Sequence, residues 1–183
     1  MRSETISTDA QTLRTVEQTI SFSQQVFQLA VVTALAVAGY FLISHYVLQA
    51  VKVEGVSMVP TLHNADQYYL KRWVYYLRTP QRGDIVVIKD PTDGSFAVKR
   101  IIAMSGESVF LKRNGRVYVN GSKLSEPYLA PGTTTFTCDK ACEEMINVGD
   151  GKYFVLGDNR GNSFDSRYYG PISRQNILGV INP

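Results

Sequence analysis

The sequence predicts a mainly β domain that follows one membrane-spanning helix near the N-terminus. A long apolar stretch without charged residues lies close to the start of the chain. After it come short β-branched segments bounded by turn residues, which are typical of strands. No helical periodicity of useful length occurs in residues 52–183. The 183 residues are enough for one compact domain with an appendage.

The apolar stretch contains no Asp, Glu, Lys or Arg from Gln18 to Val51. As a helix, Val26–Val51 would be roughly 39 Å long, whereas the hydrocarbon core of a bilayer is about 30 Å thick. A cleaved signal peptide would have a shorter apolar region, nearer to a basic N-terminus. A helix of a soluble core would show a polar face, which residues 29–43 almost lack. We therefore expect a tail at 1–25, a spanning helix at 26–51 and a β domain at 52–183.

The strands of the β domain are predicted from runs such as "DIVVIKD" and "KYFVLGD". Asn114-Gly115 separates two of the runs and predicts a type I′ hairpin turn, and Asn120-Gly121 marks a second turn. The segment Pro127–Gly151 has the weakest signal and is expected to be a loop. The expected strands are 84–90, 96–104, 108–113, 116–121, 152–158 and 177–181.

Composition limits the chemistry that this chain can perform. The net charge of +3 is spread along the chain, so we expect no nucleic-acid partner, which would need a clustered basic face. With His45 and His63 as the only histidines, we expect no metal site and no cofactor. Cys138 and Cys142 lack further zinc ligands nearby, and a local disulfide is favoured over two free thiols.

Ser57, in "VEGVSMVPTL" (53–62), is a candidate nucleophile, and a serine hydroxyl needs a base to activate it. His63 follows Pro60 in an expected turn, which is typical of a surface histidine. Lys99 lies in the apolar strand "FAVKRII", where its side chain and that of Arg100 leave opposite faces. Inward burial would lower the pKa of Lys99 from about 10.4 and leave a neutral amine that accepts a proton. An outward lysine would simply be solvated.

The segment "GDNRGNSFDSRYYGPI" (157–172) is a dense polar set with glycines near both ends. One interpretation is a loop held by Asp–Arg pairs and by bonds from side chains to the backbone. The other gives one hydroxyl, such as that of Ser163, the task of orienting a catalytic amine.

Three of these segments together resemble the type I signal peptidases, which are membrane-anchored serine proteases with a Ser/Lys dyad. The segments are "GVSMVPTL" behind a spanning helix, "VKRIIAMSGE" and "GDNRGNSFDSRYYGP", in the family's order. The resemblance covers roughly residues 26–183. It implies a signal-peptidase-like β catalytic domain that removes N-terminal signal peptides from translocated pre-proteins through an acyl-enzyme.

The resemblance also implies a role for each matching residue. Ser57 matches the nucleophile, and its backbone N–H matches part of the oxyanion hole. Lys99 matches the general base, and Ser163 matches the serine that orients the lysine amine. The residues that match structural supports of the loop are Asp158, Asp165 and Arg167. The residues expected to line shallow apolar substrate pockets are Val53, Met58, Leu62, Ala97 and Val98.

Two positions depart from patterns within this family. Gly55 stands where some members have a serine that donates to the oxyanion, so only backbone is available there. Gly161 stands where many members have an acidic residue. Neither position belongs to the Ser/Lys dyad.

The resemblance places the tail in the cytoplasm of a bacterium and residues 52–183 on the outer side of its plasma membrane. The expected partners are pre-proteins with signal peptides and the lipid bilayer. Residues 72–77, "RWVYYL", then fit either the lipid interface, where Trp and Tyr are enriched, or a core strand.

Other functions remain as alternatives to a general signal peptidase. A specialised relative, such as a pilin-processing or organelle inner-membrane peptidase, would share the motifs. A self-cleaving repressor-type peptidase would need a DNA-binding helical module, which the sequence lacks. A non-catalytic β domain tethered to the membrane would use the polar loop only as a structural element.

Overall fold

A single apolar helix, Phe22–Phe41, is the first element in our computed structural model, which describes residues 22–41, 49–136 and 143–182. Its 20 residues are long and apolar enough to cross a membrane, with a length of about 30 Å at 1.5 Å per residue. The chain divides between His45 and Tyr46 into two separate units. Most of the expected tail, and both Cys138 and Cys142, lie outside the described residues.

The prediction that the spanning helix continues to Val51 is wrong, because Gln49–Lys52 form strand β1. This strand pairs antiparallel with β2 (Gln67–Leu70), with Gln49 opposite Leu70 and Lys52 opposite Gln67. The side chain of Val51 packs on the core beneath this sheet. An apolar run of this length suits a strand as well as a helix end, and pairing with β2 decides the outcome.

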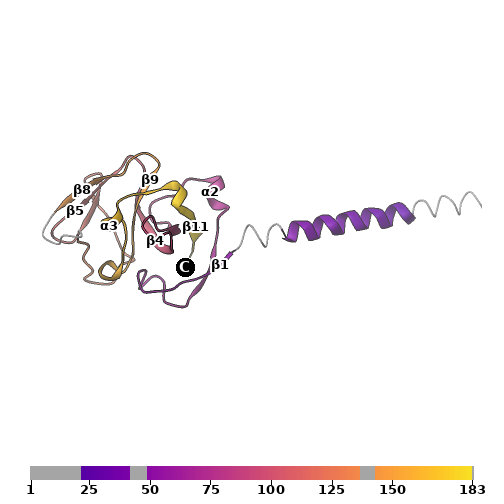
Figure 1. The fold of residues 1–183 in the computed structure, drawn as a ribbon, viewed down its shortest axis with the longest axis horizontal. Coiled ribbons are helices and arrows are strands. Elements are labelled where there is room, and N and C mark those ends of the chain that lie inside the picture. Colours follow the sequence, from indigo (N-terminus) through magenta and orange to yellow (C-terminus); the bar gives the residue numbers. More distant parts are fainter. Residues whose placement is uncertain (1–21, 42–48, 137–142, 183) are drawn as a thin grey trace, which may run out of the picture. The chain divides into compact units, whose positions relative to one another are not determined.

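The described residues of the second unit form three antiparallel sheets, which confirms the predicted mainly β class (Figure 1). Their strand orders are β1-β2, β10-β9-β4-β3-β11 and β7-β6-β5-β8. The remaining strands are β3 (Ile85–Lys89), β4 (Phe96–Ala103), β5 (Ser108–Leu111), β6 (Val117–Val119), β7 (Ser122–Lys123), β8 (Glu144–Asn147), β9 (Lys152–Leu156), β10 (Ile172–Ser173) and β11 (Ile177–Ile181). The short helices are α2 (Val74–Leu77), η1 (Arg160–Asn162), α3 (Ser166–Tyr169) and η2 (Arg174–Asn176).

Each of the six expected strands contains a strand of the structure, and the five strands that were not expected are short. Three of the four residues are exposed in β1 and in β8, and two of the four in β2, while β7 and β10 have two residues each. β8 lies within the segment predicted to be a loop. Such strands show little alternation of β-branched residues, from which a strand could be predicted. They are held by hydrogen bonds to a neighbouring strand rather than by burial of alternate residues.

The type I′ turn predicted at Asn114-Gly115 is wrong. Such a turn needs positive φ at both central residues, and only Gly115 has one, at 75°. The hairpin instead closes over Lys112–Arg116, with a hydrogen bond from Lys112 N to Arg116 O of 3.1 Å. Positive φ at both positions occurs at Asn120 and Gly121, between β6 and β7.

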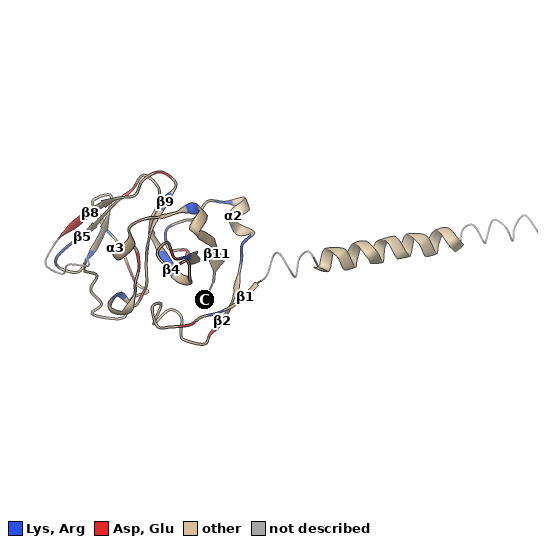
Figure 2. Ribbon diagram, in the orientation of Figure 1, with Lys and Arg blue, Asp and Glu red and all other residues tan. Residues whose placement is uncertain are grey.

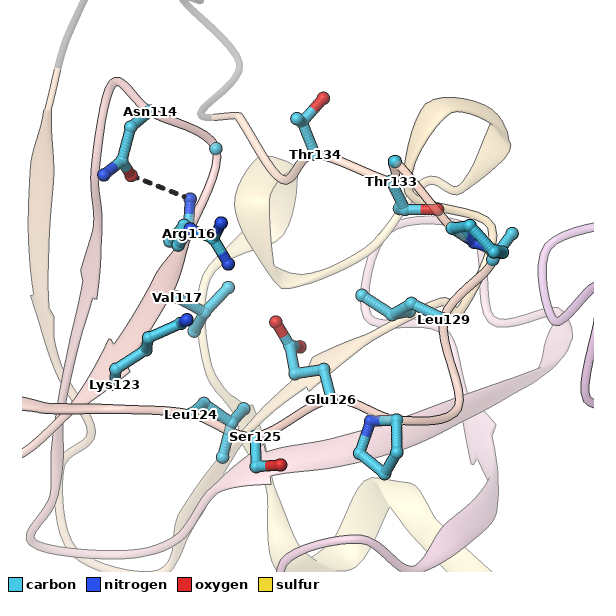
Figure 3. Close-up of a pocket in the computed structure, with 15 residues that line it drawn as sticks. Asn114, Arg116, Val117, Lys123, Leu124, Ser125, Glu126, Leu129, Thr133 and Thr134 are labelled. Carbon is cyan, nitrogen blue, oxygen red and sulfur yellow. Dashed lines mark hydrogen bonds between the residues drawn. The ribbon is translucent and has the colours of Figure 1, made fainter.

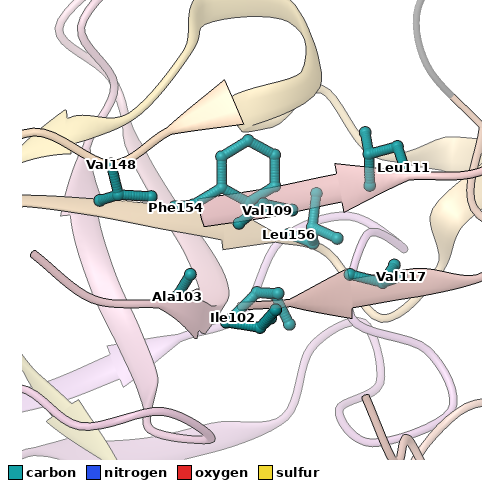
Figure 4. Packing of buried hydrophobic residues seen from close by; sticks show 9 residues of the cluster. Ile102, Ala103, Val109, Leu111, Val117, Val148, Phe154 and Leu156 are labelled. Carbon is teal, nitrogen blue, oxygen red and sulfur yellow. The ribbon is translucent and has the colours of Figure 1, made fainter. Parts of the chain in front are cut away.

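The buried hydrophobic residues of the described part of the chain form three clusters. Between the second and third sheets, Phe154 and Leu156 of β9 pack against Val109 and Leu111 of β5 (Figure 4). Beneath β1 and β2, a second cluster includes Met58 and Leu62. The segment between β1 and β2 is therefore fixed against the sheet that contains β4.

Candidate active site

The amine of Lys99 and the hydroxyl of Ser57 lie within hydrogen-bond distance. Lys99 Nζ donates to Ser57 Oγ over 3.2 Å. Ser57 follows β1 in a turn that begins and ends on paired backbone, with bonds from Val53 N to Asp66 O and from Ala65 N to Val53 O. Lys99 lies in the middle of β4, opposite Val86. Two segments far apart in the sequence thus bring a nucleophile and a base together.

Lys99 is buried, with 4% of its surface exposed. Burial lowers the pKa of its amine, and the positive charge of Arg167 acts in the same direction. The carboxylates of Asp165 and Asp90 oppose this shift. Because desolvation penalises the ammonium form, the site favours a neutral amine that can accept a proton.

Strand β4 is buried on both faces at this point, so neither Lys99 nor Arg100 faces solvent. Arg100 points away from Lys99 and binds Asp158 through two hydrogen bonds, Nε to Oδ1 at 2.9 Å and Nη2 to Oδ2 at 2.7 Å. The hydroxyl of Thr61 donates to the same Oδ2 over 2.5 Å. Arg100 and Thr61 thereby connect β4, the Ser57 turn and the polar loop.

The polar loop, residues 157–172, donates hydrogen bonds to the backbone around Ser57. Asn159 N donates to the carbonyl of Ser57 over 2.9 Å, and its side-chain amide donates to Val56 O over 3.1 Å. At Gly157, an added Cβ would collide with the side chain of Ser163 and with the carbonyl of Ser57. Glycine is required here because backbone and side chains approach too closely for any side chain.

Asp165 and Arg167 hold the other end of the loop, consistent with a supporting position. Their paired bonds measure 2.8 Å from Nε to Oδ1 and 2.9 Å from Nη2 to Oδ2. Asp165 Oδ2 also accepts from Gly157 N at 3.0 Å, and Arg167 Nη2 donates to Ser163 O at 3.2 Å. These bonds fix the backbone on both sides of Ser163.

Ser163 lies beside Gly157 at the base of the site, and its Oγ is buried without a hydrogen-bond partner among the described residues. The expected bond to the Lys99 amine is therefore not formed in this geometry. A buried hydroxyl without a partner is unusual. Hydrogen bonds of catalytic groups often tighten only when substrate is bound.

Several supporting residues had no predicted role. Arg160, 3% exposed, binds the carbonyl of Gly157 at 3.0 Å, the hydroxyl of Thr135, and Glu126 Oε1 at 2.5 Å. The guanidinium of Arg100 lies over the ring of Tyr128, 3.9 Å from its centroid. The polar composition of residues 157–172 points to Arg160, but no local pattern reveals Glu126 or Tyr128.

Glu126 also faces a hollow of about 620 Å³, where Figure 3 shows it in the same space as Val117 and Leu129. This hollow is enclosed by residues 114–117 and 123–134. None of its lining residues is Ser57 or Lys99, so it is separate from the cleft that contains these two residues.

A cleft of about 620 Å³ opens at Ser57 and Lys99, lined by residues 51–58, 96–99, Val87 and Asn162. Of the five predicted pocket residues, Val53, Met58, Ala97 and Val98 line it. Leu62 does not: its side chain is completely buried in the core beneath β1 and β2. Leu62 N donates to Met58 O over 3.0 Å, and this turn directs Leu62 inward.

Gly55 lies in the turn before Ser57 with φ of 98°, a conformation that strongly favours glycine. Its N–H donates to Asn64 Oδ1 over 2.9 Å. Glycine therefore suits the backbone conformation at this position. The other departure, Gly161, has open space around its Cα. Among the described residues, no group of three His, Cys, Asp or Glu side chains could hold a metal ion.

Comparisons with known proteins agree on one family. The profile of the family described as "Signal peptidase, peptidase S26" matches residues 24–182. The chain is 40% identical over 159 residues to a signal peptidase I from Bacillus amyloliquefaciens, covering 82% of this chain and 79% of the relative. It is 38% identical over 162 residues to signal peptidase I T from Bacillus subtilis (strain 168), with the same coverage.

A solved structure of a signal peptidase I from Enterococcus faecalis V583 has a TM-score of 0.49 and 31% sequence identity. The match covers 57% of this chain and 98% of that one. The family profile and the Bacillus relatives each cover most of the chain. The chain therefore belongs to the signal peptidase family, peptidase S26.

Proposed function

We propose that this protein is a membrane-bound serine endopeptidase that cleaves N-terminal signal peptides from pre-proteins, with Ser57 as nucleophile and Lys99 as general base. The observation that carries the proposal is the 3.2 Å contact between Lys99 Nζ and Ser57 Oγ. It lies in a cleft, and burial favours the neutral amine. The family and its relatives named signal peptidase I support the same substrate class.

In the first half-reaction, the neutral amine of Lys99 takes the proton of Ser57 Oγ as this oxygen attacks the scissile carbonyl carbon. The backbone N–H of Ser57 stabilises the oxyanion that develops. The Lys99 ammonium then gives its proton to the leaving amine. The products of this step are the released amine fragment and an ester between Ser57 and the signal peptide.

In the second half-reaction, Lys99 accepts a proton from a water molecule that attacks the ester. The tetrahedral intermediate collapses, Ser57 Oγ regains a proton, and the signal peptide leaves with a free carboxyl group. Ser163, whose hydroxyl has no partner in this geometry, orients the amine of Lys99 when substrate closes the site. Asp158, Asp165 and Arg167 keep the loop in position.

The cleft supports selection of small apolar residues before the scissile bond. Its lining at Val53, Met58, Ala97 and Val98 is apolar, and Met58 is almost completely buried. Shallow apolar pockets bind small side chains and reject large ones sterically. No bound metal or cofactor takes part in the proposed steps.

The apolar helix Phe22–Phe41 anchors the protein in the bilayer, since its length matches the hydrocarbon core. We place the N-terminal tail in the cytoplasm of a bacterium and the catalytic unit on the outer side of its plasma membrane. There the unit meets pre-proteins after their translocation.

A non-catalytic binding domain does not explain the burial of Lys99. Burying an ammonium group without an ion pair destabilises a fold, and a purely structural site would be more stable with an apolar residue. The contact to a serine hydroxyl gives that burial a chemical use.

The direct test is cleavage of a purified pre-protein by the full chain in detergent. Wild type should release the mature protein with a new N-terminus at the signal-peptide junction, as sequencing of the product would show. Lys99→Ala should abolish release. Lys89→Ala, which removes an exposed lysine from the adjacent strand β3, is the matched control and should cleave normally. Equal activity of the two variants would contradict the proposal.

A further inference from the structure

The side-chain amide of Asn159 binds the peptide group that precedes Ser57. Asn159 Nδ2 donates to Val56 O over 3.1 Å, between positions 103 apart in the sequence. Asn159 N donates to Ser57 O over 2.9 Å. Val56 O and the N–H of Ser57 belong to one planar, trans peptide group, so they point in opposite directions. A bond that holds this carbonyl therefore also fixes the direction of the Ser57 N–H.

The N–H of Ser57 is available to bind an oxyanion. Within the described part of the chain it donates no hydrogen bond. Gly55 has no side-chain donor, and its own N–H already donates to Asn64 Oδ1 over 2.9 Å. The direction of the Ser57 N–H therefore matters more here than in a site that also has a side-chain donor.

The amide of Asn159 is not used by its own helix. Asn159 is the N-cap residue of η1, where an asparagine side chain usually accepts a hydrogen bond from a backbone N–H of the helix. That bond is not formed in η1. Instead, Asn159 Oδ1 accepts from Asn162 Nδ2 over 3.2 Å, which leaves Nδ2 directed at Val56. Asn162 itself lines the cleft that contains Ser57.

Buried ion pairs on both sides of Asn159 hold the backbone from which its side chain extends. Asp158 pairs with Arg100 at 2.7 Å, and Arg160 pairs with Glu126 at 2.5 Å. The side chains of Asp158 and Arg160 are both 0% exposed. Because its two neighbours are fixed in this way, Asn159 presents its amide from a rigid support.

We propose that Asn159 is a positioning residue for the oxyanion hole, whose amide holds the peptide group between Val56 and Ser57 so that the Ser57 N–H points at the oxyanion. The inference rests on the proposed function, in which this N–H stabilises the developing negative charge. Asn159 touches no reacting atom and moves no proton. Because it acts on an interaction that is strongest in the transition state, its effect should appear in kcat rather than in KM.

Asn159→Ala should lower kcat of the full chain on a pre-protein in detergent and leave KM nearly unchanged. Loss of a whole oxyanion donor lowers kcat by about 10²–10³-fold, so loss of its positioning should lower kcat by about tenfold. The effect is smaller because Val59 N also donates to Val56 O, over 3.2 Å.

Asn176→Ala is the matched control for this assay. Asn176 Nδ2 likewise donates to a backbone carbonyl, that of Lys89 at 2.9 Å, but it lies outside the cleft. This variant should cleave like wild type. Equal values of kcat for Asn159→Ala and Asn176→Ala would overturn the proposal.

The pH dependence distinguishes Asn159 from the groups that act on the amine of Lys99. Asparagine carries no charge, so both substitutions leave the charged positions drawn in Figure 2 in place. The ascending limb of kcat/KM should therefore stay at the wild-type pH in Asn159→Ala, although the rate is lower at every pH. A limb that moves would mean that Asn159 acts on Lys99 and would contradict the proposal.

A peptide boronic acid tests the oxyanion hole directly. Ser57 Oγ adds to the boron, the hydroxyl proton passes to the amine of Lys99, and the tetrahedral boronate that forms carries the negative charge. The same peptide with a methyl group in place of the boronic acid cannot form this adduct. Asn159→Ala should weaken binding of the boronic acid by about tenfold, like kcat, and leave binding of the methyl peptide unchanged. Equal weakening for both peptides would show a purely structural role and overturn the proposal.

The behaviour of wild type separates this inference from the proposed function. If wild type neither cleaved a pre-protein nor bound the boronic acid, the proposed function would be refuted, and this inference with it. If wild type did both, and Asn159→Ala kept full kcat and full affinity for the boronic acid, this inference alone would be refuted.

Discussion

Lys99 Nζ donates a hydrogen bond to Ser57 Oγ over 3.2 Å, across a separation of 42 positions in the sequence. The bond connects the middle of a buried strand with a turn that follows the first strand of the domain. Lys99 is 4% exposed, so its amine is desolvated where it meets the hydroxyl.

Replacing Lys99 by Met should abolish cleavage and stabilise the fold at neutral pH. Loss of a general base lowers kcat by about 10²–10⁴-fold or more, whereas loss of a buried ammonium removes a desolvation penalty. Between the lowered pKa of Lys99 in the folded state and about 10.4 in the unfolded chain, the unfolded chain binds the extra proton. The unfolding free energy of wild type therefore rises with pH in this window.

Thermal unfolding at several pH values checks the stability part of this prediction. The advantage of Lys99→Met over wild type should shrink as the pH rises through the window. An advantage that stays constant with pH would mean that the burial of charge is not its cause.

The rate of cleavage should rise with pH as Lys99 loses its proton. Because burial lowers the pKa of Lys99, the ascending limb of kcat/KM should lie below the ordinary lysine range. The negative charge of Asp90 raises this pKa, so Asp90→Asn should move the limb to lower pH. A limb that stays in place, or moves upward, would argue against Lys99 as the titrating group.

Gly157→Ala should nearly abolish activity, because the added methyl group would collide with Ser163 and with the carbonyl of Ser57. The backbone here is fixed by Asp165 and has no room to move. Gly161→Ala is the matched control in the same loop, where nothing lies within 4 Å of the new carbon. Assays of both variants should show a large loss for the first and near wild-type rates for the second.

Breaking the buried pair of Arg100 and Asp158 should destabilise the domain. The side chains are 9% and 0% exposed, and removal of one partner of such a pair destabilises by about 3–5 kcal/mol. Arg100→Met should therefore lower the unfolding free energy measured with urea. The double variant Arg100→Met/Asp158→Leu should recover part of this loss. If the double variant lost more unfolding free energy than the two single variants lose together, charge burial would not be the cause.

Leu62→Ala should affect stability rather than substrate binding, because Leu62 is completely buried in the core. The expected loss is about 2–5 kcal/mol, with KM unchanged for the folded enzyme. Val98→Ala, in the cleft, should change KM at a smaller cost in stability. An increase in KM for Leu62→Ala without a loss of stability would indicate that Leu62 contacts the substrate.

Residue composition and local pattern were enough to predict the β class, the apolar helix and the segments that carry the chemistry. Strands such as Ile85–Lys89 were predictable because buried strands leave a local record of β-branched residues. Ser57, Lys99 and the loop at 157–167 stood out because their residue types are unusual in their surroundings. The end of the helix near Gln49 was not predictable, since an apolar run suits strand and helix alike.

Which side chains contact one another depends on the three-dimensional packing of distant segments. The sequence states that Lys99 and Arg100 leave opposite faces of β4, but not that both faces are buried, one against Ser57 and the other against Asp158. The sequence predicted that Leu62 and Met58 both line the substrate pocket, although a turn directs Leu62 into the core. Glu126 and Tyr128 support the site from a distant segment without any local sign. Such contacts form only when distant segments pack together, so no short segment of the sequence predicts them.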